Sequence, residues 1–412
     1  MTSPVWHPFT QHGLEGGFPL VARAEGALLH GADGRSWIDA ISSWWVTTHG
    51  HCHPRIMQAI AEQAGQLDQL IFAGWTHRPA EDLAAGLVRI TPPELTRVFF
   101  SDSGSTSVEV ALKMALGYWA NRGEARHRIV VLEHSYHGDT IGAMSVGQRG
   151  VFNRAYAPLL FDVVTVPFPH PGREQATYDA LQGACSGDAA AFIVEPLVLG
   201  AGGMLVYSPG VFKEMRAICA ASGTLFIADE VMTGWGRTGT LLACEQAGVV
   251  PDLLCLSKGL TGGTMPLAVT MASESIFAAH CAPDRGKMFF HSSSYTANPL
   301  ACAAANANLA IWRDEPVLDR IALLAQRQSA RLAALEKVEN RRTCGTIAAA
   351  DVPGGEGYLA TVGPRLAAFA RERGVLLRPL GNTLYVMPPY CTEEAQLDAI
   401  YAVIAEGLTA LA

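Results

Sequence analysis

Short apolar runs alternate with amphipathic stretches through the middle of the chain. Five runs are almost uninterrupted in apolar residues and have the length of single strands: Val98–Phe100, Ile129–Leu132, Phe192–Val194, Leu225–Ala228 and Leu253–Leu256. Such runs are typical of a parallel sheet, because helices cover both of its faces and bury every strand residue. Between the first two runs, apolar residues recur at helical spacing from Val108 to Trp119. The pattern predicts a doubly wound α/β domain with a parallel sheet.

The two ends of the chain carry a different pattern. Apolar residues at helical spacing predict a long amphipathic helix over residues 316–335, and Leu384–Met387 predicts a short strand before a last helix. The first forty residues are typical of strands and turns, with a hairpin loop at Gly31–Gly34. This mixture indicates an α+β arrangement at both ends.

The length of the chain favours two domains, because 412 residues exceed what one hydrophobic core usually organises. We predict a large domain at residues 43–314 and a small α+β domain that combines residues 1–42 with residues 315–412. Apolar residues make up 49% of the chain and charged residues 17%, which excludes a disordered or fibrous protein.

Net charge, cysteine spacing and the apolar runs indicate which partners and which cellular location to expect. Thirty Lys and Arg residues against 38 Asp and Glu residues give a net charge of −8 without a basic block, so we expect no nucleic-acid partner. The nine cysteines form no C-x-x-C pair, which indicates reduced thiols rather than disulfides or a zinc site. Met1–Pro8 lacks the features of a signal peptide, and no apolar run approaches the ~18 residues of a membrane helix. We therefore expect a cytoplasmic protein without a membrane partner.

Two motifs resemble ligand sites but favour a structural interpretation. Gly234–Gly239 matches G-x-G-x-x-G, yet it does not directly follow the preceding strand and no helix pattern begins at its end. A dinucleotide fingerprint joins a strand directly to a helix, so we interpret this segment as a glycine loop. His49, His51 and His53 alternate before a proline without a further ligand nearby, so we predict a turn into a helix and no metal.

Polar residues follow several of the predicted strands. Ser101–Thr106 leaves a strand and enters a helix, where free N–H groups can cradle an anion or a side chain can simply cap the helix. Asp229 closes one strand and Lys258 follows the next, so both should lie at the carboxyl edge of the sheet, where ligands bind in open α/β folds. The simple alternative is an ion pair. Small residues around Lys258 favour a bulky planar ligand instead.

A lysine, an acid and a phosphate cradle are the components of a pyridoxal phosphate site, in which the lysine holds the cofactor and the acid faces its ring nitrogen. His134–Gly138 ends another strand and adds the aromatic face of Tyr136. Because these motifs fall together at strand ends, the sequence predicts this cofactor.

In this order the motifs resemble those of class III aminotransferases of fold type I, over nearly the whole chain. The resemblance implies an α/β large domain with a mixed, mostly parallel sheet. The shared segments are Asp102–Ser105, Tyr136–Gly138, Asp229–Val231, Gly236–Gly239 and Ser257–Gly259. Further segments are similar to the members of this family in biotin biosynthesis: Trp6–Thr10, Ser42–Trp45, Leu260–Thr264, Asn298–Cys302 and Arg378–Gly381. The resemblance implies an aminotransferase that makes 7,8-diaminononanoate from 8-amino-7-oxononanoate.

The resemblance also implies roles for individual residues. Lys258 would hold the cofactor and then move the proton, and Asp229 would pair with the ring nitrogen, which makes these two the catalytic residues. Gly104 and Ser105 would bind the phosphate, and Tyr136 would stack on the ring and border the substrate channel.

Substrate contacts are implied beside the cofactor. Trp45 would shape the channel, Arg378 would bind a substrate carboxylate, and Phe9 would stand where many members have a tyrosine that touches the substrate. Glu195 is expected to pair with Arg237. No metal is implied.

A second copy of the chain is expected to complete the site. In the family, a Gly-Pro-Thr-like turn reaches the phosphate across a dimer interface, and Ser292–Ser294 stands in its place here. The resemblance implies that Ser293 and Ser294 contact the cofactor and that Ser292 lies at the substrate, in a homodimer.

Two amino donors are considered, and S-adenosylmethionine is favoured over lysine. Trp44 and Trp45 resemble members that use S-adenosylmethionine, a cation that can lie against tryptophan faces. Phe9 and the altered turn at Ser294 are closer to members that use lysine, and a broad ω-amine:pyruvate transaminase is a further alternative. A cofactor-binding regulator is not favoured, because the chain has no basic helix-turn-helix segment.

Overall fold

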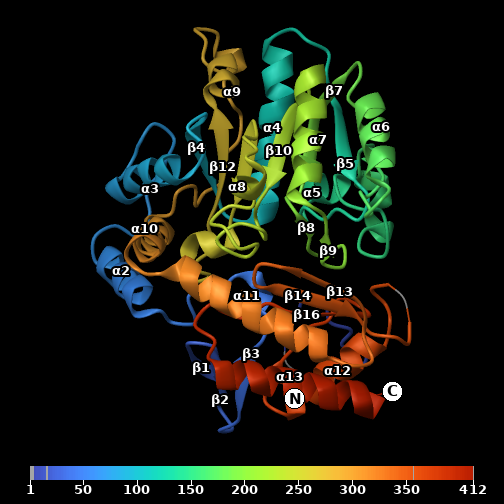
Figure 1. Ribbon diagram of the computed structural model, residues 1–412. Helices are drawn as coiled ribbons and strands as arrows, with labels where there is room; N and C mark the ends of the chain where they lie inside the picture. The colour runs from blue at the N-terminus through green and yellow to red at the C-terminus, as the bar shows by residue number, and fades with distance from the viewer. Residues whose placement is uncertain (1–3, 15–16, 356, 412) are drawn as a thin grey trace.

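The computed structural model describes residues 4–14, 17–355 and 357–411, so Met1–Ser3 of the opening segment lie outside the described residues. Figure 1 shows two bodies, one above the other, with helix α11 (Val317–Ala334) running along the boundary between them. The upper body is built on a large sheet, and both ends of the chain lie in the lower body.

A seven-stranded sheet, counted over the described residues, forms the centre of the upper body, with the strand order β4-β12-β11-β10-β7-β5-β6. The strands are β4 Leu95–Ser101, β5 Arg128–Leu132, β6 Val164–Val166, β7 Ala189–Val194, β10 Leu225–Asp229, β11 Leu253–Leu256 and β12 Ala268–Ser273. Strand β12 runs antiparallel to both of its neighbours, and the other pairs are parallel. The prediction of a mixed, mostly parallel sheet is confirmed, including all five strands that the apolar runs indicate.

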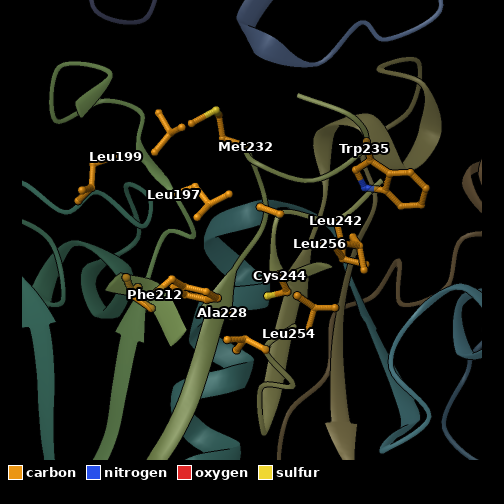
Figure 2. Packing of buried hydrophobic residues seen from close by; sticks show 14 of the residues in the cluster. Leu197, Leu199, Phe212, Ala228, Met232, Trp235, Leu242, Cys244, Leu254 and Leu256 are labelled. Carbon is orange, nitrogen blue, oxygen red and sulfur yellow. The ribbon is translucent and has the colours of Figure 1, made fainter. Parts of the chain in front are cut away.

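Helices cover both faces of this sheet, because alternate residues of a strand point to opposite sides. On one face, α4 (Gly104–Asn121) shares an apolar cluster with Ile193 of β7. On the other face, α7 (Pro209–Ser222) packs with its Phe212 close to Ala228 of β10, as Figure 2 shows. The packed faces hold the strand ends rigidly at the carboxyl edge of the sheet.

The lower body contains two smaller sheets, with the orders β1-β2-β3-β15 and β13-β14-β16. Their strands are β1 Val21–Glu25, β2 Leu28–Gly31, β3 Ser36–Asp39, β13 Glu339–Cys344, β14 Ile347–Asp351, β15 Val375–Leu376 and β16 Thr383–Val386. The antiparallel pairing of β2 with β3 confirms the predicted hairpin loop, and α11 confirms the predicted long helix. The domain boundaries at residues 43 and 314 stay a prediction.

The remaining elements connect these sheets. The other α-helices are α1 Ser42–Trp45, α2 Pro54–Ala64, α3 Arg78–Ile90, α5 Ile141–Ser145, α6 Glu174–Ala184, α8 Cys244–Ala247, α9 Glu274–Ala279, α10 Pro299–Asp314, α12 Val362–Glu372 and α13 Glu394–Leu411. The 3-10 helices are η1 Arg154–Leu159, η2 Lys258–Thr261 and η3 Arg285–Lys287, and β8 Val198–Leu199 pairs with β9 Leu205–Val206. Over the part of the chain that the structure describes, no helix is both long enough and apolar enough to cross a membrane.

The two motifs with a structural interpretation fold as predicted. Gly234–Gly239 lies in a series of turns between β10 and α8, not at a strand-to-helix junction. The segment with alternating histidines leads into α2, and its three imidazoles bind separate partners. These partners of His49, His51 and His53 are, in order, Asn308, Asp39 and Glu315.

Candidate functional site

A cavity of about 340 Å³ opens at the carboxyl edge of the seven-stranded sheet, between the upper and lower bodies. Most of the predicted site residues line it: Phe9, Trp45, Gly104, Ser105, Tyr136, Asp229, Lys258 and Arg378. Strand ends and the start of α4 supply one side, while the lower body contributes residues from both ends of the chain. Segments that are far apart in the sequence therefore meet in one cavity.

Lys258 lies just beyond the end of β11 and begins η2 with a positive φ of 48°. Its Nζ lies 4.5 Å from the centre of the Trp45 ring. Burial lowers the pKa of Lys258 to about 8, although the carboxylates of Asp229 and Glu195 oppose this shift by favouring the ammonium. An appreciable fraction of the amine is therefore neutral near pH 8, as covalent attachment and proton transfer by a lysine require.

Asp229 is the last residue of β10, and its carboxylate is buried. Its Oδ2 lies 2.6 Å from Nδ1 of His137, and its Oδ1 accepts the backbone N–H of Val231 at 3.1 Å. Since a carboxylate only accepts, Nδ1 of His137 carries the hydrogen. His137 is a site residue that the sequence analysis does not single out, although it stands in the middle of the Tyr-His-Gly motif.

The start of α4 has the properties of an anion cradle. Ser103 caps this helix, and the N–H groups of Ser103 and Thr106 are taken by each other's side chains. The first-turn N–H groups of Gly104 and Ser105 have no partner inside the helix. A Cβ on Gly104 would lie 2.6 Å from Val231, so glycine keeps this space open. The serine cap is therefore present, and the binding of an anion by the neighbouring N–H groups stays a prediction.

Tyr136 and Glu195 form a connected part of the wall. The backbone N–H of Tyr136 donates to Oε1 of Glu195 at 3.1 Å, and the N–H of Gly200 donates to Oε2 at 2.9 Å. Burial raises the pKa of Glu195 to about 7 and also raises the pKa of the Tyr136 phenol. Glu195 therefore holds the backbone that presents the Tyr136 ring to the cavity.

The predicted pairing of Glu195 with Arg237 is wrong. Arg237 is almost completely buried and donates to the backbone carbonyls of Pro388, Trp45 and Thr47. Its guanidinium uses these main-chain carbonyls as acceptors, while the two oxygens of Glu195 accept the backbone N–H groups of Tyr136 and Gly200.

Aromatic side chains and one cation form the outer part of the cavity. The guanidinium of Arg378 lies 4.6 Å from the ring centre of Trp44, and its Nη2 donates to the carbonyl of Phe9 at 3.4 Å. The rings of Phe152 and Tyr358 also line the cavity, with their centres 4.4 Å apart. These two rings come from irregular segments, so no periodic pattern in the sequence identifies them.

The backbone around Trp45 has an unusual conformation, which directs its ring into the cavity. Ser42, Ser43 and Trp45 all have positive φ angles, which residues with a Cβ rarely adopt. The indole Nε1 of Trp45 donates to the hydroxyl of Tyr385 at 2.9 Å and so fixes the ring against the lower body. Such clustered strain is characteristic of functional sites.

Ser292–Ser294 are not among the residues that line this cavity in the described chain. The Ser293 hydroxyl donates to the carboxylate of Asp102, and the carbonyl of Ser294 accepts from Gln69. The structure of one chain therefore does not bring these serines to Lys258. Their predicted contacts with cofactor and substrate depend on a second copy.

The residues of the cavity fit pyridoxal phosphate. The free N–H groups at the start of α4 suit a phosphate, the oriented carboxylate of Asp229 suits a protonated ring nitrogen, and Lys258 supplies the attachment point. The glycine beside the cradle fits as well, since a Cβ on Gly138 would lie 2.1 Å from the Ser105 hydroxyl. In the described residues, no group of three or more His, Cys, Asp and Glu side chains could hold a metal.

Comparison with known proteins agrees with this geometry. Residues 13–408 match the family Aminotransferase class-III. The chain is similar to the adenosylmethionine-8-amino-7-oxononanoate aminotransferase of Synechococcus elongatus, with 50% identity over 98% of each chain. A protein of the same name from Nitratidesulfovibrio vulgaris is 40% identical over 99% of this chain and 80% of its own length.

Solved structures show the same relationship. The crystal structure of adenosylmethionine-8-amino-7-oxononanoate aminotransferase from Methanocaldococcus jannaschii has a TM-score of 0.93 and 33% identity, over 98% of this chain and 97% of that chain. A PLP-bound amine transaminase from an uncultivated Pseudomonas species has a TM-score of 0.93 and 30% identity over the whole of both chains. The chain therefore belongs to the class III aminotransferases, enzymes of fold type I that use pyridoxal phosphate.

Proposed function

We propose that the chain transfers an amino group from S-adenosylmethionine to 8-amino-7-oxononanoate, producing 7,8-diaminononanoate in biotin biosynthesis. The observation that carries the proposal is that Lys258, Asp229 and Arg378 line one cavity. This provides a lysine to hold the cofactor, an acid for its ring and a cation for a substrate carboxylate. Support for the substrate comes from a relative named for this reaction, which is 50% identical over 98% of the chain.

Lys258 would accept and return the proton that moves during amino transfer. When bound, pyridoxal phosphate supplies an electron sink that stabilises negative charge next to the amino group. Lys258 would hold the cofactor and, once its Nζ is free as a neutral amine, take and return the proton. Its lowered pKa supports this role, because a fully protonated lysine could not accept a proton.

Asp229 would hold the ring nitrogen in its protonated form. The contacts to His137 and to the N–H of Val231 orient the carboxylate before any ligand binds. A partner that is already oriented costs no reorganisation when charge develops in the reaction. The site residues assigned to the phosphate in this proposal are Gly104 and Ser105, and Tyr136 is assigned to the ring face.

Arg378 would bind the substrate carboxylate through its planar, bidentate guanidinium. The aromatic rings of Phe9, Trp44 and Phe152 surround it with apolar surface. Such a wall suits the methylene chain of a long keto acid better than a short, polar substrate. Trp45 would border the same channel closer to Lys258.

S-adenosylmethionine is the donor in this proposal, because its sulfonium and adenine can interact with tryptophan faces, each contact being worth roughly 0.5–2 kcal/mol. Lysine is the alternative donor, and its second ammonium would require an acid. Asp139, which is exposed at the cavity, could serve as that acid. A broad amine transaminase is a second alternative, since a structural relative carries that name.

The donor is tested by mixing the cofactor-loaded enzyme with each donor alone and following the absorbance of the bound cofactor. Conversion by S-adenosylmethionine but not by lysine supports the proposal. Rapid conversion by lysine alone would overturn the choice of donor and leave the aminotransferase assignment intact.

A homodimer and a cytoplasmic location belong to the same proposal. Ser293 and Ser294 would reach the phosphate of the second copy, and Ser292 its substrate. Large apolar side chains on nearby loops are exposed in the single chain and would be covered by a partner: Ile71, Trp75, Phe290 and Tyr295. Light scattering of the purified protein should give the mass of two chains, and the mass of one chain would contradict the dimer.

The proposed cytoplasmic location is supported by the nine free cysteines, which are in keeping with a reducing compartment.

The attachment point is tested by reduction of the loaded enzyme with borohydride and mass spectrometry of its peptides. The proposal requires the cofactor-derived mass on Lys258. The same mass on any other lysine would overturn the assignment of the site.

A further inference from the structure

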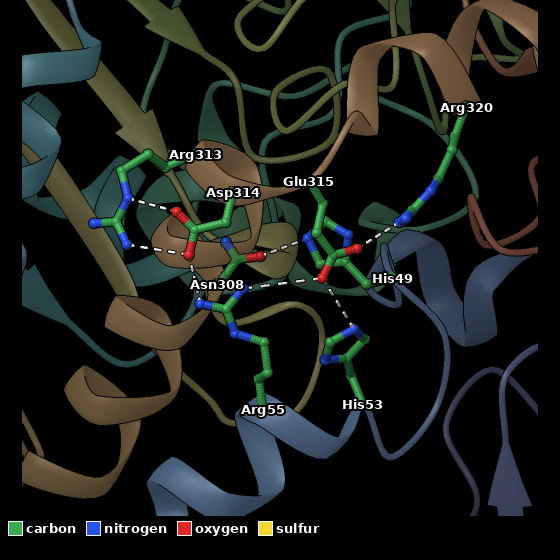
Figure 3. A network of polar contacts seen from close by, with 8 residues as sticks. All are labelled: His49, His53, Arg55, Asn308, Arg313, Asp314, Glu315 and Arg320. Carbon is green, nitrogen blue, oxygen red and sulfur yellow. Dashed lines mark hydrogen bonds and ion pairs between the residues drawn. The ribbon is translucent and has the colours of Figure 1, made fainter.

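The buried amide of Asn308 connects helix α10 to the turn that carries Lys258. Its Nδ2 donates to the carbonyl oxygens of Gly259 and Leu260, each at 3.0 Å. Its Oδ1 lies 2.8 Å from Nε2 of His49. Asn308 is completely buried and His49 almost so, and Figure 3 shows both within a wider polar network.

These contacts determine which atoms donate. Carbonyl oxygens only accept, so the end of Asn308 that faces Gly259 and Leu260 must be its NH₂ group. The amide oxygen therefore faces His49, and Nε2 of His49 must carry a hydrogen. Burial lowers the pKa of His49 to about 4, so at neutral pH the ring is uncharged and keeps this single hydrogen in the bond to Asn308.

The turn that this amide binds has a strained backbone. Lys258 has a φ of 48°, in the left-handed region that a lysine rarely adopts. Lys258 begins a 3-10 helix of only four residues, Lys258–Thr261, and Gly262 directly after it is also left-handed. Such a short segment has few hydrogen bonds of its own, so contacts from outside must hold its conformation.

The segment of His49 contacts the same turn a second time. The backbone N–H of Thr48 donates to the carbonyl of Gly262 at 3.3 Å. His49 itself is held by edge-to-face contacts with Trp312 and Tyr390, whose ring centres lie 5.7 Å and 6.2 Å away. The turn after Lys258 is therefore attached to a rigid part of the fold at both ends.

We propose that His49 and Asn308 are positioning residues, which fix the turn after Lys258 and so direct its amine into the cavity. The proposal rests on the function of Lys258 proposed above. Neither residue is part of the cavity lining in the described chain, so both act through Lys258 and not on the ligands. A displacement of a reacting group by about 1 Å is enough to slow a reaction by roughly 100-fold.

Four variants test this role. Asn308→Leu removes the amide at similar volume, and Asn306→Leu is its matched control, because Asn306 lies on the same helix but donates to the carbonyl of Pro79 at 2.8 Å. His49→Leu removes the Nε2–H donor, and His49→Gln returns an N–H donor to that place. If Asn308→Leu fails to fold, the same role is tested by comparing His49→Leu, which lacks the donor, with His49→Gln, which restores it.

Two readouts are measured on each variant. Labelling of the cofactor-free chain with acetic anhydride over a range of pH, followed by mass spectrometry, reports the pKa of the Lys258 amine. Steady-state amino transfer by the loaded enzyme reports the rate and KM. In Asn308→Leu and His49→Leu we expect that pKa to rise by roughly half a unit or more, and transfer to slow about 10- to 100-fold with KM changed less than about threefold. His49→Gln and Asn306→Leu should stay within about threefold of the natural chain.

Equal labelling and equal transfer rates in Asn308→Leu and Asn306→Leu would overturn the positioning role. A slow His49→Leu that His49→Gln does not rescue would overturn it as well. Attachment of the cofactor to another lysine in the natural chain would instead refute the function of Lys258, so the failures of the two proposals are distinguishable.

Discussion

Nδ1 of His137 lies 2.6 Å from Oδ2 of Asp229, and both side chains are buried at the cavity. The second oxygen of Asp229 accepts the backbone N–H of Val231. Within the described residues, Nε2 of His137 is buried without a hydrogen-bond partner, so the hydrogen bond of this imidazole is the one from Nδ1 to Asp229. The direction of the carboxylate at the end of β10 therefore depends on His137.

Replacing His137 by Phe should weaken cofactor binding. The carboxylate of Asp229 would keep one N–H donor and lose the other, and a hydrogen bond to a charged group is worth ~1.5–3 kcal/mol. The dissociation constant for pyridoxal phosphate should rise roughly 10- to 100-fold, measured by absorbance titration of the cofactor-free protein. An unchanged constant in a normally folded variant would mean that His137 only fills space.

Asp229→Asn should slow the chemistry more than it weakens binding. An amide cannot keep the ring nitrogen protonated, and removal of one oriented electrostatic partner typically costs about 10²- to 10³-fold in rate. The measurement is the single-turnover half-reaction with the amino donor alone. A rate close to that of the natural chain would assign Asp229 a structural role.

Lys258→Met should stabilise the cofactor-free protein at neutral pH. Burial disfavours the Lys258 ammonium in the folded chain, where its pKa is about 8, compared with roughly 10.4 in an unfolded chain. Between these values the unfolded chain binds more protons, so the stability of the natural chain rises with pH in that window. The variant should be more stable by roughly 3 kcal/mol at pH 7, and its advantage should shrink towards pH 10.

Urea unfolding of both cofactor-free proteins at pH 7 and pH 9.5 checks this prediction. Other titrating groups are common to the two chains and cancel in the difference. An advantage that is the same at both pH values would show that the folded-state pKa of Lys258 is not lowered.

Arg378→Ala should raise the KM for the keto acid. Loss of a charged, bidentate partner costs ~1.5–3 kcal/mol, or roughly 10- to 100-fold, whereas a monoamine without a carboxylate should be affected much less. Arg373→Ala is the control, since Arg373 pairs with Glu406 at 3.1 Å and does not line the cavity in the described chain. The measurement is steady-state kinetics with the keto acid and with the monoamine. An equal loss of activity with both substrates would indicate a disturbed fold.

The inner part of the site is predictable from the sequence. Lys258 and Asp229 each end or follow a short, fully apolar run, and a polar residue at that position must lie at the carboxyl edge of a parallel sheet. Strand β12 is harder to predict, because Ala268–Ser273 contains threonine and serine and runs antiparallel to its neighbours.

Contacts between distant segments are not predictable in the same way. Arg237 donates to the main-chain carbonyls of Trp45 and Thr47. Every residue has such a carbonyl, so the sequence does not indicate which of them accept a hydrogen bond. Phe152 and Tyr358 reach the cavity from irregular segments that lack any period. Only the folded chain shows that these rings meet.

The proposed reaction can be tested by direct detection of its product. Purified enzyme is incubated with pyridoxal phosphate, 8-amino-7-oxononanoate and S-adenosylmethionine, with Lys258→Ala as the inactive control, and the mixture is examined by mass spectrometry. 7,8-Diaminononanoate should form in the reaction of the natural chain and should be absent with Lys258→Ala. Absence of this product with S-adenosylmethionine and with lysine, in enzyme that still converts simple amines, would contradict the proposed reaction.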